Sequence, residues 1–366
     1  MVSICHITTV HPAFDDRIFH RECKTLANAG YSVYLIASHY KDEVVTGVHI
    51  LHLPRKNSRL YRFLVKDWIA LLKALYVNAQ VYHFHDPELI FVGLLLKLFG
   101  KKVIYDVHED VGKQILNKNW LGSLFIRKFI SGIFDFVEQI VSSKFDAIVA
   151  ATESITKRFD PNKTILLRNF SILELIDKAE PAYRDTDKFI IIYAGGLTRI
   201  RGIKEIIQAI GLLNGSVELW LFGRWESERF EEECKLINGW ENVRYFGFRK
   251  LEEVYSFMKA CNAGIVTLYP QKNYLYSLPV KAFEYMACKL PIVMSNFSYW
   301  KDFFKDCALF VDPSDPRDIA DKISFLVENS VVVWKLGNNG RRLVQTKYSW
   351  EAESKKLVLL YRELIK

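Results

Sequence analysis

The segment IYAGGLTRIRG, residues 192–202, combines glycine and arginine in a pattern that suits a phosphate group. An apolar run leads into Gly195 and Gly196, and Arg199 and Arg201 follow before a predicted helix. Glycines let the backbone approach a phosphate closely, and a helix N-terminus offers free N–H groups and a positive dipole end. Two guanidinium groups could neutralise a diphosphate. The segment is neither a GxGxxG nor a Walker motif, so a turn with solvent-exposed arginines is the alternative.

A second candidate segment, YLYSLPVKAFEYMACKLPIV, covers residues 274–293. We expect Ser277 to cap a helix there. The backbone N–H groups of Ser277, Leu278 and Val280 would then face a phosphate. Glu284 has apolar neighbours, so we expect its carboxylate to be partly buried and to accept both hydroxyls of a ribose. The alternative is a glutamate on the surface of an amphipathic helix.

Histidines and carboxylates follow two apolar runs of the N-terminal half. VYHFHDPEL supplies His85 and Asp86, and VIYDVHED supplies His108. Each group lies where a parallel strand is predicted to end, and active sites form at that edge of an α/β sheet. His83, inside the first run, is interpreted as a buried strand residue. A metal ion could use such a cluster, but no HxxxH spacing or neighbouring cysteine supports one, and we expect no metal.

Apolar, β-branched runs alternate with amphipathic helical patterns along the whole chain, which predicts a doubly wound α/β fold. Several runs are continuously apolar, as is typical of parallel strands buried on both faces. Two Rossmann-like domains with parallel sheets follow from this pattern, and we expect both to face a central cleft that holds the ligand. The predicted strands cover 2–10, 31–37, 48–53, 81–85, 103–107 and 146–151, then 189–194, 217–222, 243–246, 264–268 and 291–294.

The polar segment EPAYRDTD, residues 180–187, is interpreted as a linker. We therefore assign residues 1–175 to an N-terminal domain and residues 186–345 to a C-terminal domain with the phosphate and ribose segments. Residues 346–366 are expected to form a final helix that packs back on the N-terminal domain.

The net charge of +8 is concentrated in the first half, where residues 1–170 hold 22 Lys and Arg against 16 Asp and Glu. This excess predicts an anionic partner, such as phosphates or an acidic membrane surface, and ordinary solubility is the alternative. We expect no nucleic-acid partner. No apolar run reaches the roughly 18 residues of a membrane span. The start lacks the basic region of a signal peptide, and the six cysteines include no CxxC pair, so we expect a cytoplasmic protein.

Two segments of the N-terminal half mix aromatic, aliphatic and basic residues. Residues 117–144 include Trp120, Arg127 and Lys128, and residues 55–76 have a similar composition. Helices of this kind lie in a membrane interface with their apolar side among the acyl chains, which predicts peripheral contact with an anionic membrane. The alternative is that both helices pack on the N-terminal sheet.

In order and spacing, the two C-terminal segments resemble those of the retaining GT-B glycosyltransferases of family 4, the "glycosyl transferases group 1". Arg201-Gly202 stands where the family has Lys-Gly, and Glu284-Tyr-Met-Ala and Pro291-Ile-Val match its second motif. LWLFGR, NVRYFGF and YSWE extend the resemblance over nearly the whole chain. Two positions depart from the family. Tyr276 replaces a glutamate that contacts the donor sugar, and Gly196 replaces a basic residue, for which Arg199 is expected to compensate.

The resemblance implies a hexosyltransferase that moves a sugar, with retention, from a nucleotide sugar to a glycan or lipid-linked acceptor. A UDP-sugar is the expected donor, and no cofactor or metal is implied. The setting would be bacterial polysaccharide or glycolipid biosynthesis at the inner face of the membrane. Catalytic roles are implied for His108, Arg199 and Arg201. The residues implied to bind the nucleotide sugar are Gly195, Gly196, Arg199, Arg201, Phe246, Tyr276, Ser277, Leu278, Val280 and Glu284.

The loop TTVHPAFDDRIFHRE stands where many members have a Gly-rich loop, and in this it resembles a subset of bacterial surface-polysaccharide transferases. We assign His11, Asp16, Arg17, His85 and Asp86 to the acceptor side. Arg17 would pair with an anionic acceptor, whereas Asp16 could instead only cap a helix. Two other functions remain open, a sugar-nucleotide epimerase of the same fold and an inactive transferase that acts as a binding partner.

Overall fold

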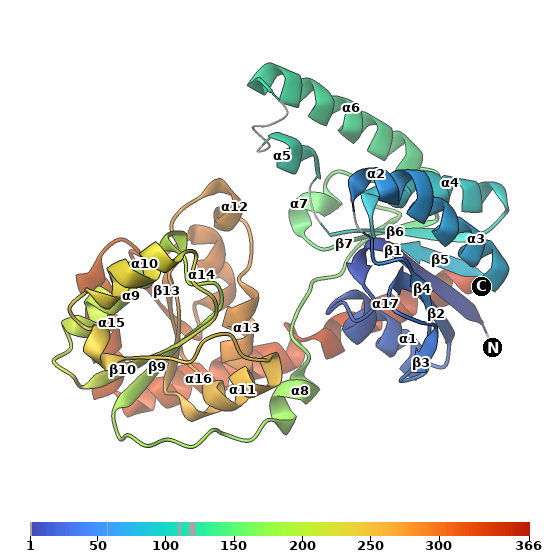
Figure 1. Cartoon of the computed structure of the whole chain (residues 1–366). Helices are drawn as coiled ribbons and strands as arrows, with labels where there is room; N and C mark the ends of the chain where they lie inside the picture. The colour runs from blue at the N-terminus through green and yellow to red at the C-terminus, as the bar shows by residue number, and fades with distance from the viewer. Residues whose placement is uncertain (1, 57, 109–110, 117–121) are drawn as a thin grey trace. The chain divides into compact units, whose positions relative to one another are not determined.

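The computed structural model describes residues 2–56, 58–108, 111–116 and 122–366. The chain divides into two compact units, Met1–Asn169 with Glu353–Lys366, and Phe170–Ala352 (Figure 1). The boundary lies after Asn169 and not after residue 175, because Phe170 and Leu173 are buried in the core of the second unit.

The N-terminal unit is built on an eight-stranded sheet with the order β3-β4-β2-β1-β5-β6-β7-β8. Its strand pairs are parallel apart from β3 with β4. The sequence pattern indicates six of these strands but not β3 or β8, since three residues are too few to show a period. The strands are β1 (Ser3–Pro12), β2 (Ser32–Ser38), β3 (Glu43–Val45), β4 (Val48–Leu53), β5 (Val81–Phe84), β6 (Lys102–Val107), β7 (Ala147–Ala150) and β8 (Thr164–Leu166).

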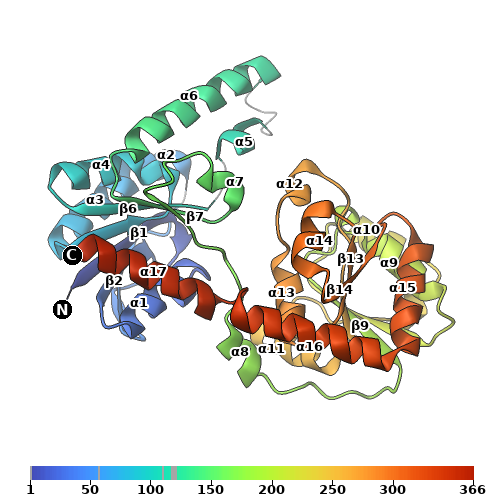
Figure 2. The same cartoon turned by 180° about the vertical axis from the view of Figure 1, so that it is seen from behind.

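Helices cover this sheet, and the final helix of the chain lies against it (Figure 2). Tyr361 of that helix is fully buried, and its hydroxyl lies 2.8 Å from His83 Nδ1. Among the described residues, no helix is both long and apolar enough to cross a bilayer. The helices are η1 (Ile18–Cys23), α1 (Lys24–Asn28), α2 (Arg59–Tyr61), η2 (Arg62–Lys66), α3 (Asp67–Val77), η3 (Pro87–Leu89), α4 (Ile90–Leu98), α5 (Val111–Leu116), α6 (Leu124–Ser142), α7 (Glu153–Thr156) and α17 (Trp350–Ile365).

The C-terminal unit is built on a six-stranded, parallel sheet with the order β11-β10-β9-β12-β13-β14. The strands are β9 (Phe189–Ala194), β10 (Val217–Phe222), β11 (Val243–Tyr245), β12 (Ala263–Val266), β13 (Ile292–Ser295) and β14 (Ala308–Val311). The helices are α8 (Leu173–Lys178), η5 (Arg199–Arg201), α9 (Ile203–Gly211), α10 (Glu228–Lys235), η6 (Trp240–Asn242), α11 (Leu251–Ala260), α12 (Lys272–Leu275), α13 (Val280–Ala287), α14 (Ser298–Phe304), α15 (Pro316–Glu328) and α16 (Ser330–Thr346).

Strands buried on both faces explain the continuous apolar runs of the C-terminal unit. Along β9, Ile190 and Ile192 point into one hydrophobic cluster and Ile191 and Tyr193 into another. Alternate side chains of a strand point to opposite faces of a sheet, so a strand covered on both sides must be apolar at every position.

The order of the strands places one switch point in each sheet. In the N-terminal unit β1 and β5 are neighbours, and the strands that follow each of them in the chain lie on opposite sides of this pair. In the C-terminal unit β9 and β12 are such a pair. Ligands of open α/β sheets bind outside the carboxyl ends of such strands. Gly195 follows β9 directly, and His85 follows β5 directly, so the predicted site residues lie at both switch points.

Candidate functional site

The turn after β9 closes around two cationic side chains of the C-terminal unit. Gly195 has a φ of +149°, and its N–H donates to the carbonyl of Phe222 at 2.8 Å. A Cβ at position 195 would lie 2.1 Å from Lys281 Nζ and 3.1 Å from Arg201 Nη1. Glycine at this position therefore leaves the space that the two cations fill.

Tyr193 lies between these cations and the turn. Arg201 Nη1 donates to its hydroxyl at 3.5 Å, and that hydroxyl donates to the carbonyl of Gly196 at 3.0 Å. Lys281 Nζ lies 4.8 Å from the centre of the tyrosine ring. Burial, followed by the charge of Arg201, lowers the pKa of Lys281 to about 8. Two neighbouring cations beside a glycine turn form a site that suits a phosphate group.

Lys281 is a site residue that the sequence analysis did not single out. The signal that could have found it is its spacing, because it lies three residues before Glu284 on α13 and shares a helix face with it. Glu284 is half-buried, as its apolar neighbours predict, and it accepts a hydrogen bond from the hydroxyl of Tyr255 at 3.2 Å. A role for Glu284 toward a ribose stays a prediction.

The guanidinium of Arg199 contacts α10. Its Nη1 forms an ion pair with Glu233 Oε2 at 2.8 Å, and its guanidinium lies 4.4 Å from the ring centre of Phe230. Both partners belong to α10. The expectation that Arg199 supplies the cation missing at Gly196 is therefore corrected, because its guanidinium is held by α10.

Helix α13 begins at Val280, with Pro279 at its N-cap and no side-chain cap. Ser277 consequently does not cap it, which corrects the expected start of this helix. The carbonyl of Ser277 instead accepts a hydrogen bond from Trp300 Nε1 at 2.7 Å. Leu278 packs against the hydrophobic core, and Val280 is exposed. Phosphate binding by these backbone N–H groups stays a prediction.

Tyr276 and Phe246 lie in different surroundings. Tyr276 ends α12 and is 73% exposed. Phe246 packs face to face on Phe222, with ring centres 4.7 Å apart and planes within 1°. Its ring therefore contributes to the core, and a contact with the nucleotide stays a prediction for both residues.

At the carboxyl ends of β1, β5 and β6, four of the predicted polar residues come together. His11 Nε2 lies 3.6 Å from Asp86 Oδ1, and the rings of His11 and His108 are 5.8 Å apart. His108 Nε2 lies 3.2 Å from His85 Nδ1 and also 3.2 Å from Asp106 Oδ2. In this group His11 and His108 are partly exposed, so they are the members that a ligand of the N-terminal unit could reach.

Asp86 holds the backbone of the segment that carries His11. Its Oδ2 accepts hydrogen bonds from Thr9 N at 2.6 Å, Val10 N at 3.1 Å and Thr8 Oγ1 at 2.9 Å. The carboxylate is buried. It therefore positions the end of β1, and direct contact with an acceptor stays a prediction.

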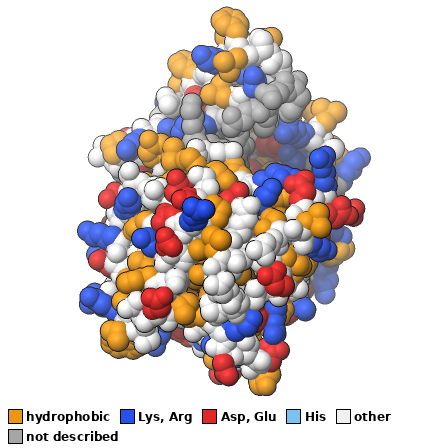
Figure 3. Space-filling view, turned by 90° about the vertical axis from the view of Figure 1, so that its left-hand side faces the viewer, with side chains coloured by type: hydrophobic (Ala, Val, Ile, Leu, Met, Phe, Trp, Pro, Cys, Tyr) orange, Lys and Arg blue, Asp and Glu red, His pale blue; other side chains and the backbone are white. Residues whose placement is uncertain are grey.

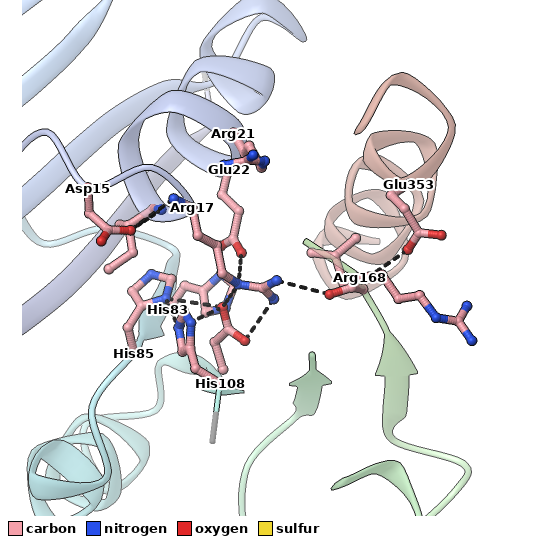
Figure 4. Close-up of polar contacts among 12 residues, drawn as sticks. Asp15, Arg17, Arg21, Glu22, His83, His85, His108, Arg168 and Glu353 are labelled. Carbon is pink, nitrogen blue, oxygen red and sulfur yellow. Dashed lines mark hydrogen bonds and ion pairs between the residues drawn. The ribbon is translucent and has the colours of Figure 1, made fainter. Parts of the chain in front are cut away.

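Arg17 lies beneath this group in a buried ion-pair cluster (Figure 4). It donates from Nε and Nη2 to the two oxygens of Asp106 at 3.1 and 3.0 Å, and from Nη1 to the carbonyl of Leu167 at 2.9 Å. Its Nε also lies 3.0 Å from Glu22 Oε1. The expectation that Arg17 pairs with an anionic acceptor is corrected, because its guanidinium is buried and already forms a bidentate ion pair with Asp106.

Burial and neighbouring charges shift the pKa values of Asp106 and of the buried histidines in this cluster. Burial alone would raise the pKa of Asp106, but Arg17 and His108 outweigh burial and hold that pKa well below its usual range. Burial lowers the pKa of His85 and of His6, so both rings are neutral at pH 7. The ionised Asp106 accepts a hydrogen bond from His85 Nδ1 at 3.1 Å, which fixes the tautomer of that ring.

Asp15, and not Asp16, caps the helical segment that follows. Asp15 Oδ1 accepts hydrogen bonds from Arg17 N and Ile18 N, both at 2.9 Å. Asp16 is exposed and forms an ion pair with Arg21 at 2.6 Å. Its assignment to the acceptor side stays a prediction.

Family models match both halves of the chain. The model described as Glycosyl transferases group 1 matches residues 177–343, and Glycosyltransferase Family 4 matches residues 16–162. An uncharacterized glycosyltransferase of Methanocaldococcus jannaschii, MJ1178, is 24% identical over 252 residues, which is 68% of either chain. The capsular polysaccharide biosynthesis glycosyltransferase CapM of Staphylococcus aureus is 23% identical over 197 residues, which is 52% of this chain and 50% of CapM.

Solved structures share the fold along the whole chain. Sucrose-phosphate synthase from Thermosynechococcus elongatus has a TM-score of 0.76 at 20% identity and covers 100% of this chain and 99% of its own. HepE of Anabaena, solved in complex with UDP, has a TM-score of 0.73 at 10% identity and covers 99% of this chain and 100% of its own. The two family matches, one over each parallel-sheet unit, place the chain among the glycosyltransferases of group 1 and family 4, and the solved structures show that it has the GT-B fold.

Proposed function

We propose that this glycosyltransferase takes its sugar from a nucleotide sugar, most simply a UDP-sugar, whose diphosphate binds at the turn after β9. The observation that carries the proposal is the position of Lys281 and Arg201 beside Gly195 at the switch point of the sheet. A diphosphate would relieve the repulsion between the two cations. Glu284, on the same helix as Lys281, would accept the ribose hydroxyls. The solved UDP complex of HepE, a protein of the same fold, supports a uridine nucleotide.

In the proposed reaction, the bond between the anomeric carbon and the diphosphate oxygen breaks, and the acceptor hydroxyl bonds to that carbon on the same face. Because the hydroxyl attacks the face that the leaving group occupied, the configuration is retained, and the departing phosphate oxygen takes the proton of the hydroxyl. Negative charge grows on the diphosphate during this step, and Arg201 and Lys281 would stabilise the transition state more than the ground state. No strong general base is needed, which is compatible with Tyr276 in place of the family glutamate. His108 would face the donor sugar.

The acceptor in this proposal is a glycan or lipid-linked sugar, and the product enters polysaccharide or glycolipid biosynthesis as a hexosyl conjugate. The similarity to CapM, a glycosyltransferase of capsular polysaccharide biosynthesis, supports this class of acceptor. The partly exposed His11 and His108 lie at the switch point of the N-terminal sheet, where an acceptor would bind.

Calorimetry with UDP and a panel of UDP-sugars tests the donor site. We expect UDP to bind the wild type, to bind Lys281→Met and Arg201→Ala more weakly, and to bind Arg199→Ala normally. Failure of UDP and other nucleoside diphosphates to bind, or equal affinity for Lys281→Met, would contradict the proposed site. Incubation of UDP-sugars without acceptor separates the alternatives, because an epimerase converts the free donor, whereas an inactive transferase binds it unchanged.

We further infer that the N-terminal unit contacts an anionic membrane through α6. Nine apolar side chains of this helix are exposed, although a helix that packs only on its own sheet would bury its apolar face. Contiguous exposed apolar side chains mark interaction sites. Trp120, which the sequence analysis includes in this segment, lies outside the described residues. The exposed apolar side chains are Leu124, Phe125, Ile126, Phe129, Ile130, Ile133, Phe136, Val137 and Ile140.

A second exposed apolar surface lies on α2, η2 and α3 and adjoins a run of cations. Residues 55–66 hold five Lys and Arg and no Asp or Glu, and three of the five, Arg55, Lys56 and Arg59, are exposed, whereas Lys66 is buried and Arg62 pairs with Glu88. Leu60, Phe63, Trp68 and Leu72 are all more than half exposed. Figures 1 and 2 draw α2 and α6 on the same side of the N-terminal sheet, and Figure 3 shows hydrophobic and basic side chains together at the top, where Figure 1 has the start of α6. Apolar surface with adjacent cations suits anionic lipid.

Sedimentation with vesicles that contain anionic phospholipid tests this inference. We expect the protein to pellet at low salt and to be released as the screening length shortens at high salt. Phe125→Ser with Phe129→Ser should reduce binding, whereas Val331→Ser with Trp334→Ser, which changes two exposed apolar residues of the C-terminal unit, should not. Wild-type protein that stays in the supernatant at low salt would refute membrane contact and favour a soluble acceptor.

A further inference from the structure

Beneath the group around His108 lies a buried cluster of three histidines and a glutamate. His6 of β1 and His83 of β5 are register partners, and His85 follows two residues after His83, so the three side chains share one face of the sheet. Glu22 of η1 covers that face (Figure 4). All four side chains are at most 2% exposed.

The spacing of these side chains matches the ligands of a single metal ion. One nitrogen or oxygen atom of each residue lies within 4.8 Å of those of the others. His6 Nδ1 is 2.9 Å from His85 Nε2 and 3.9 Å from Glu22 Oε2, and His83 Nδ1 is 3.8 Å from the same oxygen. Ligand atoms at about 2.0–2.1 Å from a tetrahedral zinc ion lie roughly 3.4 Å from one another.

Hydrogen bonds satisfy these buried groups only in part, since His6 Nδ1 pairs with His85 Nε2 at 2.9 Å and His83 Nδ1 pairs with the hydroxyl of Tyr361 at 2.8 Å. Within the described residues, neither carboxylate oxygen of Glu22 nor Nε2 of His83 has a hydrogen-bond partner. The carboxylate of Glu22 does form an ion pair with Arg17 Nε at 3.0 Å, through the oxygen that faces away from the histidines. Buried polar atoms of native proteins are almost always hydrogen-bonded or bound to an ion, so these atoms could act as metal ligands.

The outer nitrogens of two of the histidines have the partners that metal ligands usually have. His85 presents Nδ1 to the carboxylate of Asp106 at 3.1 Å, and His6 presents Nε2 to the hydroxyl of Tyr361 at 3.3 Å. A carboxylate or hydroxyl behind a histidine fixes the tautomer and orients the inner nitrogen, here into the cluster.

We propose that His6, Glu22, His83 and His85 bind one divalent transition-metal ion, with zinc the best match to three imidazoles and one carboxylate. Four protein ligands leave no open position, so the ion is structural. It ties η1 to β1 and β5, and its ligand His85 shares Asp106 with His108. The chain spacing of these residues gives no sign of the site, because its ligands come from three separate elements.

Metal analysis of the wild type tests this proposal independently of donor binding. We expect one zinc ion per chain after purification in chelator-free buffer, and the visible spectrum of a tetrahedral site after replacement with Co²⁺. Glu22→Gln should lose the ion. Asp106→Asn, which keeps all four ligands, should bind it about 10–100-fold more weakly. The control His11→Gln alters a histidine outside the cluster and should retain it.

Two results would overturn the site. One is wild-type protein that is metal-free as purified and, after refolding with Zn²⁺ or Co²⁺, acquires neither bound metal nor a tetrahedral cobalt spectrum. The other is full occupancy in Glu22→Gln. If the variants do not fold, the cobalt spectrum of the wild type decides alone, since an octahedral spectrum excludes this ligand set.

Discussion

If a diphosphate binds beside Gly195, the protein should take up a proton at alkaline pH, and Lys281 should be the group that receives it. In the free protein, burial and the charge of Arg201 lower the pKa of Lys281 to about 8. A bound anion favours the charged amine and returns its pKa to about 10.4. At pH 9 protonation should then rise from roughly 10% to 95%, an uptake of about 0.9 proton per UDP, whereas at pH 7 the uptake should be about 0.1.

Calorimetry at pH 9 in buffers with different ionisation enthalpies measures this uptake, because the observed heat then varies linearly with the buffer. Lys281→Met keeps most of the volume of the side chain and should abolish the variation. Lys305→Met removes an exposed lysine of the same unit and should leave it unchanged. Equal heats for the wild type in all buffers at pH 9 would refute the placement of the diphosphate beside Lys281.

The same pKa shift should make Lys281 a destabilising residue in the absence of nucleotide. The native protein holds fewer protons than the unfolded chain between pH 8 and 10.5, so this residue's contribution to the free energy of unfolding rises with pH across that window. Below pH 8 its full cost, at most roughly 3 kcal/mol, is present. Lys281→Met should therefore raise the urea midpoint more at pH 7 than at pH 10. A gain that does not depend on pH would contradict the shift.

Three further substitutions test other parts of the site. Glu284→Ala should weaken UDP binding by about 2–3 kcal/mol, because a charge-assisted pair of ribose hydrogen bonds is lost, and an unchanged affinity in calorimetry would remove Glu284 from the site. His108→Ala should lower turnover with the full donor while UDP affinity stays the same, and equal losses of both would place His108 elsewhere. Arg17→Met should reduce the free energy of unfolding by about 3–5 kcal/mol, since Asp106 would keep a buried charge without its main cation, and a urea midpoint close to that of the wild type would argue against this ion pair.

Much of the fold could be predicted from the sequence because buried parallel strands need apolar side chains at every position. The predicted bounds of β9 and β10 are those of the structure. The four-residue strand β14 (Ala308–Val311) was not indicated, because so short an apolar run cannot be told from part of a helix. The start of α13 was misplaced because both Ser277 and Pro279 are good residues for a helix N-terminus, and local preference cannot choose between them.

The site residues could be predicted where their position follows from the topology, but not where it follows from a partner distant in the chain. Gly195 and His85 lie at the ends of strands, which the strand pattern places at the functional edge of each sheet. The burial of Arg17 depends on Asp106, which lies 89 residues later. The direction of Arg199 depends on Glu233 of α10. The sequence of a motif segment therefore shows which charged groups are present, whereas the ion-pair partner of each group is set by the tertiary fold.

Gly196 stands where the family has a basic residue, and Lys281 supplies a cation to the same turn from α13. We expect Lys281 to take the place of the basic residue that position 196 lacks. A Cβ at position 196 would lie 3.4 Å from Arg201 Nη1, so an arginine placed there would reach the cations of the turn without a backbone clash. Lys281 reaches the same turn from α13, at the cost of a lowered pKa that an arginine would not show. Gly196→Arg combined with Lys281→Met should therefore recover much of the UDP affinity lost in Lys281→Met and should bind UDP without proton uptake at pH 9. Gly196→Arg alone should crowd three cations and lower the melting temperature of the free protein, with UDP restoring it. If the double variant binds UDP no better than Lys281→Met, the two positions do not serve one phosphate site.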